Sequence, residues 1–194
     1  MNFNTFRKGG MCVEPFRLGI LVGRFQTVHL GHVQMIRTAL ALCQRVAVFV
    51  GSSQESGTRM NPLPYEVRRQ LLQNVFGDGL EVYPLPDIGV GNNAKWGDYV
   101  IENVRRCCGQ YPDLLVSGKE ARRIDWFDGV NSLRIAELYI PKSIQICASE
   151  MRELLCRDDY DAWKQYVPQQ NRAMYPALRS YVLSAADHPE TQSL

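Results

Sequence analysis

Two short apolar runs stand near the beginning of the chain, Leu18–Val22 followed by Gly23 and Arg45–Val50 followed by Gly51. Short apolar runs closed by a glycine are typical of buried strands. Between them, from His32 to Gln44, apolar residues recur at helical spacing. A strand, a helix and a second strand in this order predict two parallel strands joined by a crossover helix.

The same alternation of strand and helix patterns continues through the middle of the chain. It predicts an α/β fold with a Rossmann-like, doubly wound parallel sheet. The elements that we expect are a helix from about Tyr65 to Val75, a strand near Leu80 to Tyr83, a helix from Trp96 to about Cys107, a strand at Asp113 to Ser117 and a short strand around Arg134 to Tyr139.

The last part of the chain has helical patterns only. One predicted helix begins with Ser149 as its N-cap, and two more cover Tyr160 to Tyr166 and Asn171 to Leu183. We expect these helices to form a small C-terminal part of one domain that spans residues 17–183. The segments 1–16 and 184–194 lack periodicity, and we expect both to be flexible.

Composition narrows the classes of protein that fit. The net charge of +2 gives no field that would attract a nucleic acid. Six cysteines are scattered without a CxxC pair, which indicates reduced thiols. The first residues lack the apolar run of a secretory signal, and no stretch reaches the roughly 20 apolar residues of a membrane span. We therefore expect a cytoplasmic protein with neither a nucleic acid nor a membrane as partner.

Two histidines, His29 and His32, lie on either side of Gly31 in the turn between the first strand and the first helix. Ligands of open parallel sheets bind beyond the carboxyl ends of the strands, where the next helix offers free N–H groups to an anion. Residues three apart at a helix start face the same side, and Gly23 and Gly31 would let the backbone approach a phosphate. The alternative is that the histidines merely cap the helix or pack against the core.

The string from Gly23 to His32, GRFQTVHLGH, resembles the GRFQPxHxGH signature of the HxGH nucleotidyltransferase superfamily, in the form of the archaeal-type nicotinamide-nucleotide adenylyltransferases. Two further segments are similar to motifs of these enzymes: Gly51–Ser56 with Asn61-Pro62 to GSxQES and NPF, and Ile146–Arg152 to ISxTxxR. The segment from Asp87 to Trp96 resembles their acceptor-binding segment. The chain departs from the family at Thr27, Cys147 and Ser149, and its Asp-to-Trp segment is about two residues longer.

This resemblance implies an enzyme of NAD biosynthesis, a nicotinamide-nucleotide adenylyltransferase that binds ATP and nicotinamide mononucleotide and uses Mg²⁺. It implies in-line attack of the acceptor phosphate on the α-phosphorus of ATP, with pyrophosphate as leaving group. The roles that it implies are catalytic for His29, His32, Arg24 and Arg152, ATP-binding for Gly23, Phe25, Gln26, Gly31, Gly51 and Ser149, and acceptor-binding for Asp87, Asn93 and Trp96.

Physical arguments support some of these roles and leave alternatives open for others. A serine at the start of a helix and an arginine three residues on suit a phosphate, although a plain capped surface helix has the same pattern. Trp96 can stack on nicotinamide or be an ordinary core tryptophan. Lys119 follows a strand on the same sheet edge and can reach a phosphate of ATP, although a solvated lysine is the commoner case.

Two other functions fit the same pattern. One is adenylyl or cytidylyl transfer to a different phosphate acceptor, although such relatives usually carry GxFDxxHxGH where this chain has Phe25-Gln26. The other is a non-catalytic module that senses NAD or another nucleotide. The sequence leaves open whether nicotinamide or nicotinic acid mononucleotide is preferred, and a homo-oligomer is possible.

Overall fold

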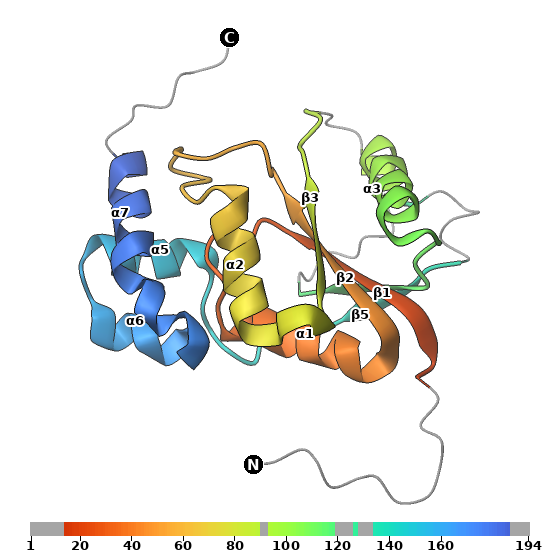
Figure 1. Cartoon of the computed structure of the whole chain (residues 1–194), viewed down its shortest axis with the longest axis horizontal. Coiled ribbons are helices and arrows are strands. Elements are labelled where there is room, and N and C mark those ends of the chain that lie inside the picture. The colour runs from red at the N-terminus through yellow and green to blue at the C-terminus, as the bar shows by residue number, and fades with distance from the viewer. Residues whose placement is uncertain (1–13, 90–92, 119–125, 128–133, 187–194) are drawn as a thin grey trace, which may run out of the picture.

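A five-stranded parallel sheet runs through the centre of the described residues (Figure 1). The structure is a computed structural model, and it describes residues 14–89, 93–118, 126–127 and 134–186. The strand order is β3-β2-β1-β4-β5, and every pairing is parallel. The strands are β1 (Phe16–Gly23), β2 (Cys43–Gly51), β3 (Glu81–Leu85), β4 (Leu114–Ser117) and β5 (Ala136–Tyr139).

Helices cover both faces of this sheet. They are α1 (Leu30–Leu42), α2 (Tyr65–Phe76), α3 (Asn93–Cys108), α5 (Ala148–Cys156), α6 (Tyr160–Tyr166) and α7 (Tyr175–Ala186), with 3₁₀ turns at Gly77–Gly79 and Gln169–Met174. In Figure 1, α3 lies on one side of the sheet and α1, α2 and the C-terminal helices lie on the other. This arrangement confirms the predicted Rossmann-like, doubly wound fold.

The core is divided into two layers because successive side chains of a strand point to opposite faces. Leu21 and Val48 belong to the cluster that packs against α1, α2 and the C-terminal helices. Their neighbours Ile20 and Phe49 belong to the second cluster, which α3 covers. Strands that are apolar on both faces are expected in a parallel sheet, and this explains why the strands were readable as continuous apolar runs.

Several predicted helix boundaries were wrong, and one of them is the start of α3, which lies at Asn93 and not at Trp96. The first helix ends at Leu42, because Cys43 and Gln44 already belong to β2, where Cys43 pairs with Phe16. The helix predicted from Asn171 begins instead as the 3₁₀ turn that ends at Met174, and α7 starts at Tyr175. Pro176 accounts for this break, since proline fits the first turn of a helix but not its interior. The predicted flexible segments 1–16 and 184–194 lie mostly outside the described residues.

The C-terminal part is joined to α2 by a buried polar contact, and its helices are joined to one another by an aromatic contact. The Asn171 side chain, fully buried, donates to the carbonyl of Leu71 (2.9 Å) and accepts from Asn74 (3.0 Å). The fully buried indole of Trp163 meets the ring of Tyr175 edge-on at 4.9 Å. No helix in the described part of the chain is long and apolar enough to cross a membrane.

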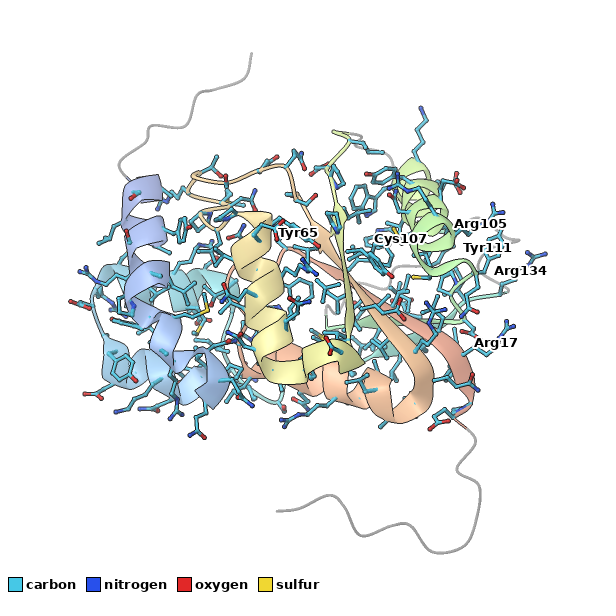
Figure 2. All side chains as sticks on the ribbon, in the orientation of Figure 1. Arg17, Tyr65, Arg105, Cys107, Tyr111 and Arg134 are labelled. Carbon is cyan, nitrogen blue, oxygen red and sulfur yellow. The ribbon has the colours of Figure 1, made fainter. Side chains whose placement is uncertain are left out.

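Charged side chains at the amino ends of the strands have a structural role. Asp113 accepts hydrogen bonds from the backbone of Arg17 (3.1 Å) and Leu18 (2.7 Å), and this joins β1 to the loop before β4. Beside it, the guanidinium groups of Arg105 and Arg134 lie 4.8 and 5.8 Å from the ring centre of Tyr111 (Figure 2). These contacts join the strands at their amino ends. The opposite edge of the sheet, at the carboxyl ends of the strands, is the one where a ligand can bind.

We predict that Trp163→Ala destabilises the fold without affecting the sheet edge. Truncating a fully buried tryptophan typically costs about 3–5 kcal/mol in the free energy of unfolding. Urea denaturation followed by circular dichroism measures this loss. The matched control is Tyr181→Ala on α7, where the ring is 39% exposed, and its effect should stay within about 0.5 kcal/mol. Equal stabilities of the two variants would contradict this description of the core.

Candidate functional site

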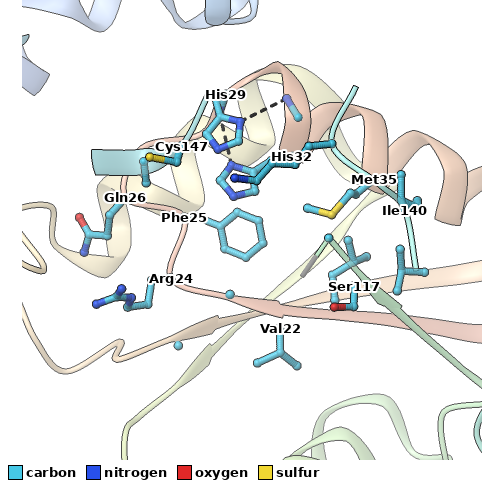
Figure 3. A pocket seen from close by; sticks show the side chains of 18 of the residues that line it. Val22, Arg24, Phe25, Gln26, His29, His32, Met35, Ser117, Ile140 and Cys147 are labelled. Atoms are coloured by element: carbon cyan, nitrogen blue, oxygen red, sulfur yellow. Dashed lines mark hydrogen bonds between the residues drawn. The ribbon is translucent and has the colours of Figure 1, made fainter. Parts of the chain in front are cut away.

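A cavity of about 580 Å³ opens at the carboxyl ends of β1, β2 and β4 (Figure 3). Its position is the switch point of the sheet, since the chain runs from β1 to β2 on one side and β4 pairs with β1 on the other. Most of the predicted site residues line it: Gly23, Arg24, Phe25, Gln26, His29, Gly31, His32, Gly51, Asp87, Trp96, Ser149 and Arg152. Lys119 and the side chain of Asn93 lie outside the described residues.

The two histidines cap the first helix with their own rings. His29 is the N-cap of α1, and its Nδ1 accepts a hydrogen bond from the backbone N–H of Gly31 (3.2 Å). His32 reaches back in the same way, so that its Nδ1 accepts from the backbone N–H of His29 (3.4 Å). The two rings are stacked with their centres 3.8 Å apart, and Phe25 lies against His32 at 4.8 Å. Capping and lining the cavity are therefore not alternatives here, because the same side chains do both.

This arrangement also determines which nitrogen carries the proton. A neutral imidazole whose Nδ1 accepts a hydrogen bond carries its proton on Nε2. Burial, and after it the charge of Lys142, lowers the pKa of His29 to about 4. Burial, followed by the neighbouring His29, holds the pKa of His32 well below its usual value. Both residues therefore offer an uncharged Nε2–H donor at neutral pH.

Glycine avoids crowding at two positions of the turn, for a reason that differs from the predicted one. A Cβ at Gly31 would lie 3.0 Å from Cε1 of His29, and a Cβ at Gly23 would lie 3.2 Å from the ring of Phe25. The space beside each glycine is thus filled by a side chain of the same turn. Glycine at these positions lets the imidazole and phenyl rings fold back onto the backbone, whereas the sequence suggested that a phosphate would use this space.

Gln26 joins the turn to a neighbouring loop. Its buried side-chain amide accepts from the backbone N–H of Leu63 (2.9 Å) and donates to the carbonyl of the same residue (3.1 Å). Its own backbone carbonyl accepts from Nη1 of Arg152 (2.8 Å). Both polar atoms of the Gln26 side chain are thus hydrogen-bonded to the backbone of Leu63. This contact fixes the position of Gln26 in the cavity wall.

The helix α5 brings a serine and an arginine to the opposite wall. The predicted N-cap was wrong: Cys147 is the N-cap, its backbone N–H donates to the Glu150 carboxylate (2.6 Å), and Ser149 lies in the first turn. This carboxylate binds the backbone N–H of the N-cap residue as in a capping box, and it stabilises the start of α5 without a serine at the N-cap. Arg152 donates to the hydroxyl of Ser149 (3.3 Å). Burial lowers the pKa of Arg152, and the positive charge of Arg24 acts in the same direction.

The end of the cavity near β3 holds the residues predicted to bind the acceptor. The side-chain amide of Gln54 forms two hydrogen bonds with the backbone of Asp87, accepting from its N–H (2.9 Å) and donating to its carbonyl (3.3 Å). The ring of Trp96 meets Trp126 edge-on with centres 6.2 Å apart, and both line the cavity. The sequence indicated no role for Trp126, since it lies thirty positions away from Trp96 in a stretch without a motif.

Lys142 is a second lining residue that the sequence did not single out. It lies in the loop between β5 and α5, and its charge acts on the pKa of both His29 and Glu150. A single lysine in a loop carries no pattern, so only the fold could bring it to the histidines.

Figure 3 shows how the labelled residues of the cavity are arranged. His29, His32 and Phe25 lie in the centre, Arg24 and Gln26 on one side, and Met35, Ser117 and Ile140 on the other.

Residues 20–137, well over half of the chain, match the family described as cytidylyltransferase-like. The chain belongs to the cytidylyltransferase-like family. The matched region contains the histidine turn, four of the strands from within β1 onward and the start of β5. The cavity at the carboxyl edge is therefore built largely from the part of the chain that defines the family.

Curated relatives of this family member are named nicotinamide-nucleotide adenylyltransferase. The protein from Saccharolobus solfataricus is 38% identical over 88 residues, which cover 42% of this chain and 50% of that protein. The protein from Thermococcus kodakarensis is 27% identical over 166 residues, which cover 78% of each. The chain spans about half the length of the Saccharolobus solfataricus relative and of a further relative from Thermococcus onnurineus.

A solved structure with the same architecture is a bifunctional NMN adenylyltransferase/ADP ribose pyrophosphatase from Francisella tularensis, complexed with AMP and a manganese ion. The TM-score is 0.69 at 22% identity, over 88% of this chain and 52% of that chain. A second structure of that protein gives a TM-score of 0.70 at 21% identity. These similarities confirm the fold of this cytidylyltransferase-like chain.

We predict that the His29 imidazole titrates near pH 4. The unfolded chain protonates this group near pH 6.5, whereas the folded protein does so only near pH 4. Since the unfolded state binds more protons between these values, the free energy of unfolding falls as pH falls, by at most about 1.4 kcal/mol per pH unit for this group. NMR titration of the imidazole signals measures the pKa, with His29→Asn to assign them. A His29 pKa near 6.5 would contradict the capped geometry.

Proposed function

We propose that this member of the cytidylyltransferase-like family is a nicotinamide-nucleotide adenylyltransferase of NAD biosynthesis, which transfers the adenylyl group of ATP to nicotinamide mononucleotide. The observation that carries the proposal is that two neutral imidazoles and two guanidinium groups line one cavity at the switch point of the sheet. Anionic phosphate is the ligand that such donors fit. The names of the curated relatives support adenylyl transfer to this acceptor.

The proposed reaction is a single displacement. An oxygen of the acceptor's 5′-phosphate forms a bond to the α-phosphorus of ATP, and the bond from this phosphorus to the oxygen that bridges the α- and β-phosphates breaks. The products are NAD and pyrophosphate. Since both nucleophile and leaving group are already phosphate oxygens, no protein group has to form a covalent intermediate. Catalysis then consists of positioning the two reactants and stabilising charge in the transition state.

In this proposal His29 and His32 donate hydrogen bonds through Nε2–H to the α-phosphate. Their low pKa values support a role as neutral donors and argue against one as positive charges. Uncharged donors that are fixed in place stabilise developing negative charge without reorganising. Such a pair keeps its donor form across the whole neutral range of pH, because neither ring titrates there.

The positive charges are assigned to the β- and γ-phosphates. Arg24 is exposed at the mouth of the cavity, and Arg152 is half-buried, with Ser149 beside it at the start of α5. We include Gly23, Phe25, Gln26, Gly31 and Gly51 as the walls of the ATP site, and Lys119 as a phosphate contact because of its position after β4. Free N–H groups at the start of α5 add to the attraction for an anion.

The acceptor is assigned to the end of the cavity where Asp87 and Trp96 lie. The indole of Trp96 gives a flat apolar surface on which a nicotinamide ring can stack. The ring planes of Trp96 and Trp126 meet at 83°. The two indoles therefore form adjacent walls of this subsite and not two parallel surfaces. Asn93, at the start of α3, is assigned to the same subsite because of its place in the motif.

We propose that Mg²⁺ enters with ATP, bound to the phosphate oxygens. No group of three or more His, Cys, Asp or Glu side chains that could hold a metal occurs within the described ranges. A divalent cation on the phosphates neutralises part of their charge. The manganese ion in the Francisella tularensis complex supports the use of such a cation.

The first test is pyrophosphate release from ATP and Mg²⁺ with nicotinamide mononucleotide, nicotinic acid mononucleotide, FMN, phosphopantetheine or no acceptor. Turnover is expected with nicotinamide mononucleotide, and NAD is identified as product by mass spectrometry. Preference for another acceptor would keep the mechanism and overturn the substrate. ATP binding by calorimetry without turnover on any acceptor would favour a nucleotide sensor.

The donor role of the histidines is tested by His29→Ser and His32→Ala. Serine can still cap α1, so His29→Ser removes the imidazole donor with little loss of helix stability. Each variant should lower kcat by about 10²- to 10³-fold. The control is Arg37→Ala, an exposed residue on the same helix, which should keep wild-type rates. Wild-type kcat in either histidine variant would refute its catalytic role.

The acceptor subsite is tested by Trp96→Ala. The loss of a stacking surface should raise KM for nicotinamide mononucleotide by about 10-fold, as expected for the loss of roughly 1–1.5 kcal/mol of aromatic contact, while KM for ATP stays unchanged. Initial rates over a grid of both substrates separate the two constants. An effect on ATP alone would place the acceptor elsewhere in the cavity.

A further inference from the structure

Arg68 in the first half of α2 is a charged side chain that is completely buried. Its guanidinium takes part in none of the ion pairs between described residues. Burying a charge without an ionic partner is unfavourable unless its donors are bound to acceptors of good geometry. The presence of such a residue next to the cavity therefore requires an explanation from its contacts.

The acceptors of Arg68 are four backbone carbonyls in two different turns. Nη1 donates to the carbonyls of Arg24 (3.2 Å) and Gly51 (2.9 Å). Nη2 donates to the carbonyls of Ser52 (3.0 Å) and Glu55 (3.3 Å). Arg24 lies in the turn after β1, and the other three lie at the end of β2 and in the loop that follows. One guanidinium thus joins the two strand ends that form the floor of the cavity.

Both turns contain a residue in a conformation that they would not hold easily by themselves. Phe25 has φ of 53° and Ser52 has φ of 47°, and neither is a glycine. Each follows directly after a carbonyl that Arg68 binds. Non-glycine residues in the left-handed region are energetically unfavourable and persist where the surrounding structure determines them. The hydrogen bonds from Arg68 hold these two residues in this conformation from the side away from the cavity.

The shape of the side chain matters as well as its charge. A planar guanidinium presents several N–H donors in a fixed fork, so its two terminal nitrogens can each bind two carbonyls. A lysine ammonium is a single point that cannot reach both turns in the same way. Burial lowers the pKa of Arg68 to about 10, so the group still carries its charge at neutral pH.

We propose that Arg68 is a positioning residue for the proposed adenylyl transfer, which holds the turns after β1 and β2 in the geometry that binds ATP. It does not line the cavity and would touch neither substrate. Its effect passes through Arg24, Phe25 and Ser52, which do line the cavity. The inference rests on the proposed function, because it is binding and turnover of ATP that the turns would serve.

A purely structural role predicts a different outcome. In that case the loss of Arg68 would lower the amount of folded protein, and the folded molecules would keep their rate constants. Asn171 provides the matched control, since it is equally buried, binds a backbone carbonyl of the same helix α2 and lies outside the cavity. Asn171→Ala should therefore lower stability while kcat/KM per folded molecule stays within about twofold of wild type.

The experiment compares Arg68→Ala, Arg68→Lys and Asn171→Ala with wild type, each normalised to its folded fraction from circular dichroism. For Arg68→Ala we expect kcat/KM for ATP to fall by about 10²-fold, in line with the cost of misplaced binding groups. Added guanidinium ion at millimolar concentration should restore part of this loss, and it should restore nothing in Asn171→Ala. Arg68→Lys should fold and lose about 10-fold in kcat/KM for ATP.

The outcomes separate this proposal from the proposed function. An active wild type with kcat/KM for ATP unchanged in folded Arg68→Ala, or in Arg68→Lys if the alanine variant does not fold, would overturn the positioning role alone. If wild type shows no turnover but binds ATP, calorimetry decides: weaker ATP binding in the Arg68 variants, reversed by guanidinium, supports positioning, and unchanged binding overturns it. A wild type that neither turns over nor binds ATP would overturn both.

Discussion

The pairing of β1 with both β2 and β4 is the constraint on which the rest of this structure depends. Because β1 lies in the middle of the sheet, the turn that follows it opens at the switch point, where helices leave on both sides. The groups that line the cavity come from the carboxyl ends of these strands, from the helices α1 and α3 that lie beside them, and from α5 with the loop that precedes it. The opposite edge is closed by Asp113 and the arginines around Tyr111.

The histidine turn shows how one set of contacts can serve folding and chemistry together. The bonds that cap α1 consume the Nδ1 atoms of His29 and His32, and they thereby fix the proton on the other nitrogen. Burial of the rings removes their positive charge over the neutral range. The capping hydrogen bonds and the burial of the rings therefore keep both imidazoles neutral, with an Nε2–H donor that suits contact with a phosphate.

The walls of the cavity are held by polar contacts that face away from it. Gln26 is fixed by Leu63, Asp87 by Gln54 and Arg152 by the backbone of Gln26. Together with the membership of the cytidylyltransferase-like family, this preorganised set of donors supports the proposed adenylyl transfer. A site of this kind binds by shape and fixed dipoles, which agrees with the small net charge of the chain.

The sequence by itself determined the fold class, the order of nearly all the strands and helices, and most of the cavity. Apolar runs and helical spacing indicate which residues are buried. The segment Gly23–His32 was predictable as a turn because its main contacts are between residues that are close together in the sequence. The sequence could not show that Cys147 rather than Ser149 caps α5, or that rings occupy the space beside Gly23 and Gly31. Trp126, Lys142 and the buried guanidinium of Arg68 also came only from the tertiary structure, because each acts through neighbours that are distant along the chain. Contacts of this kind leave no periodic signal, and they exist only once the sheet has brought the strand ends together.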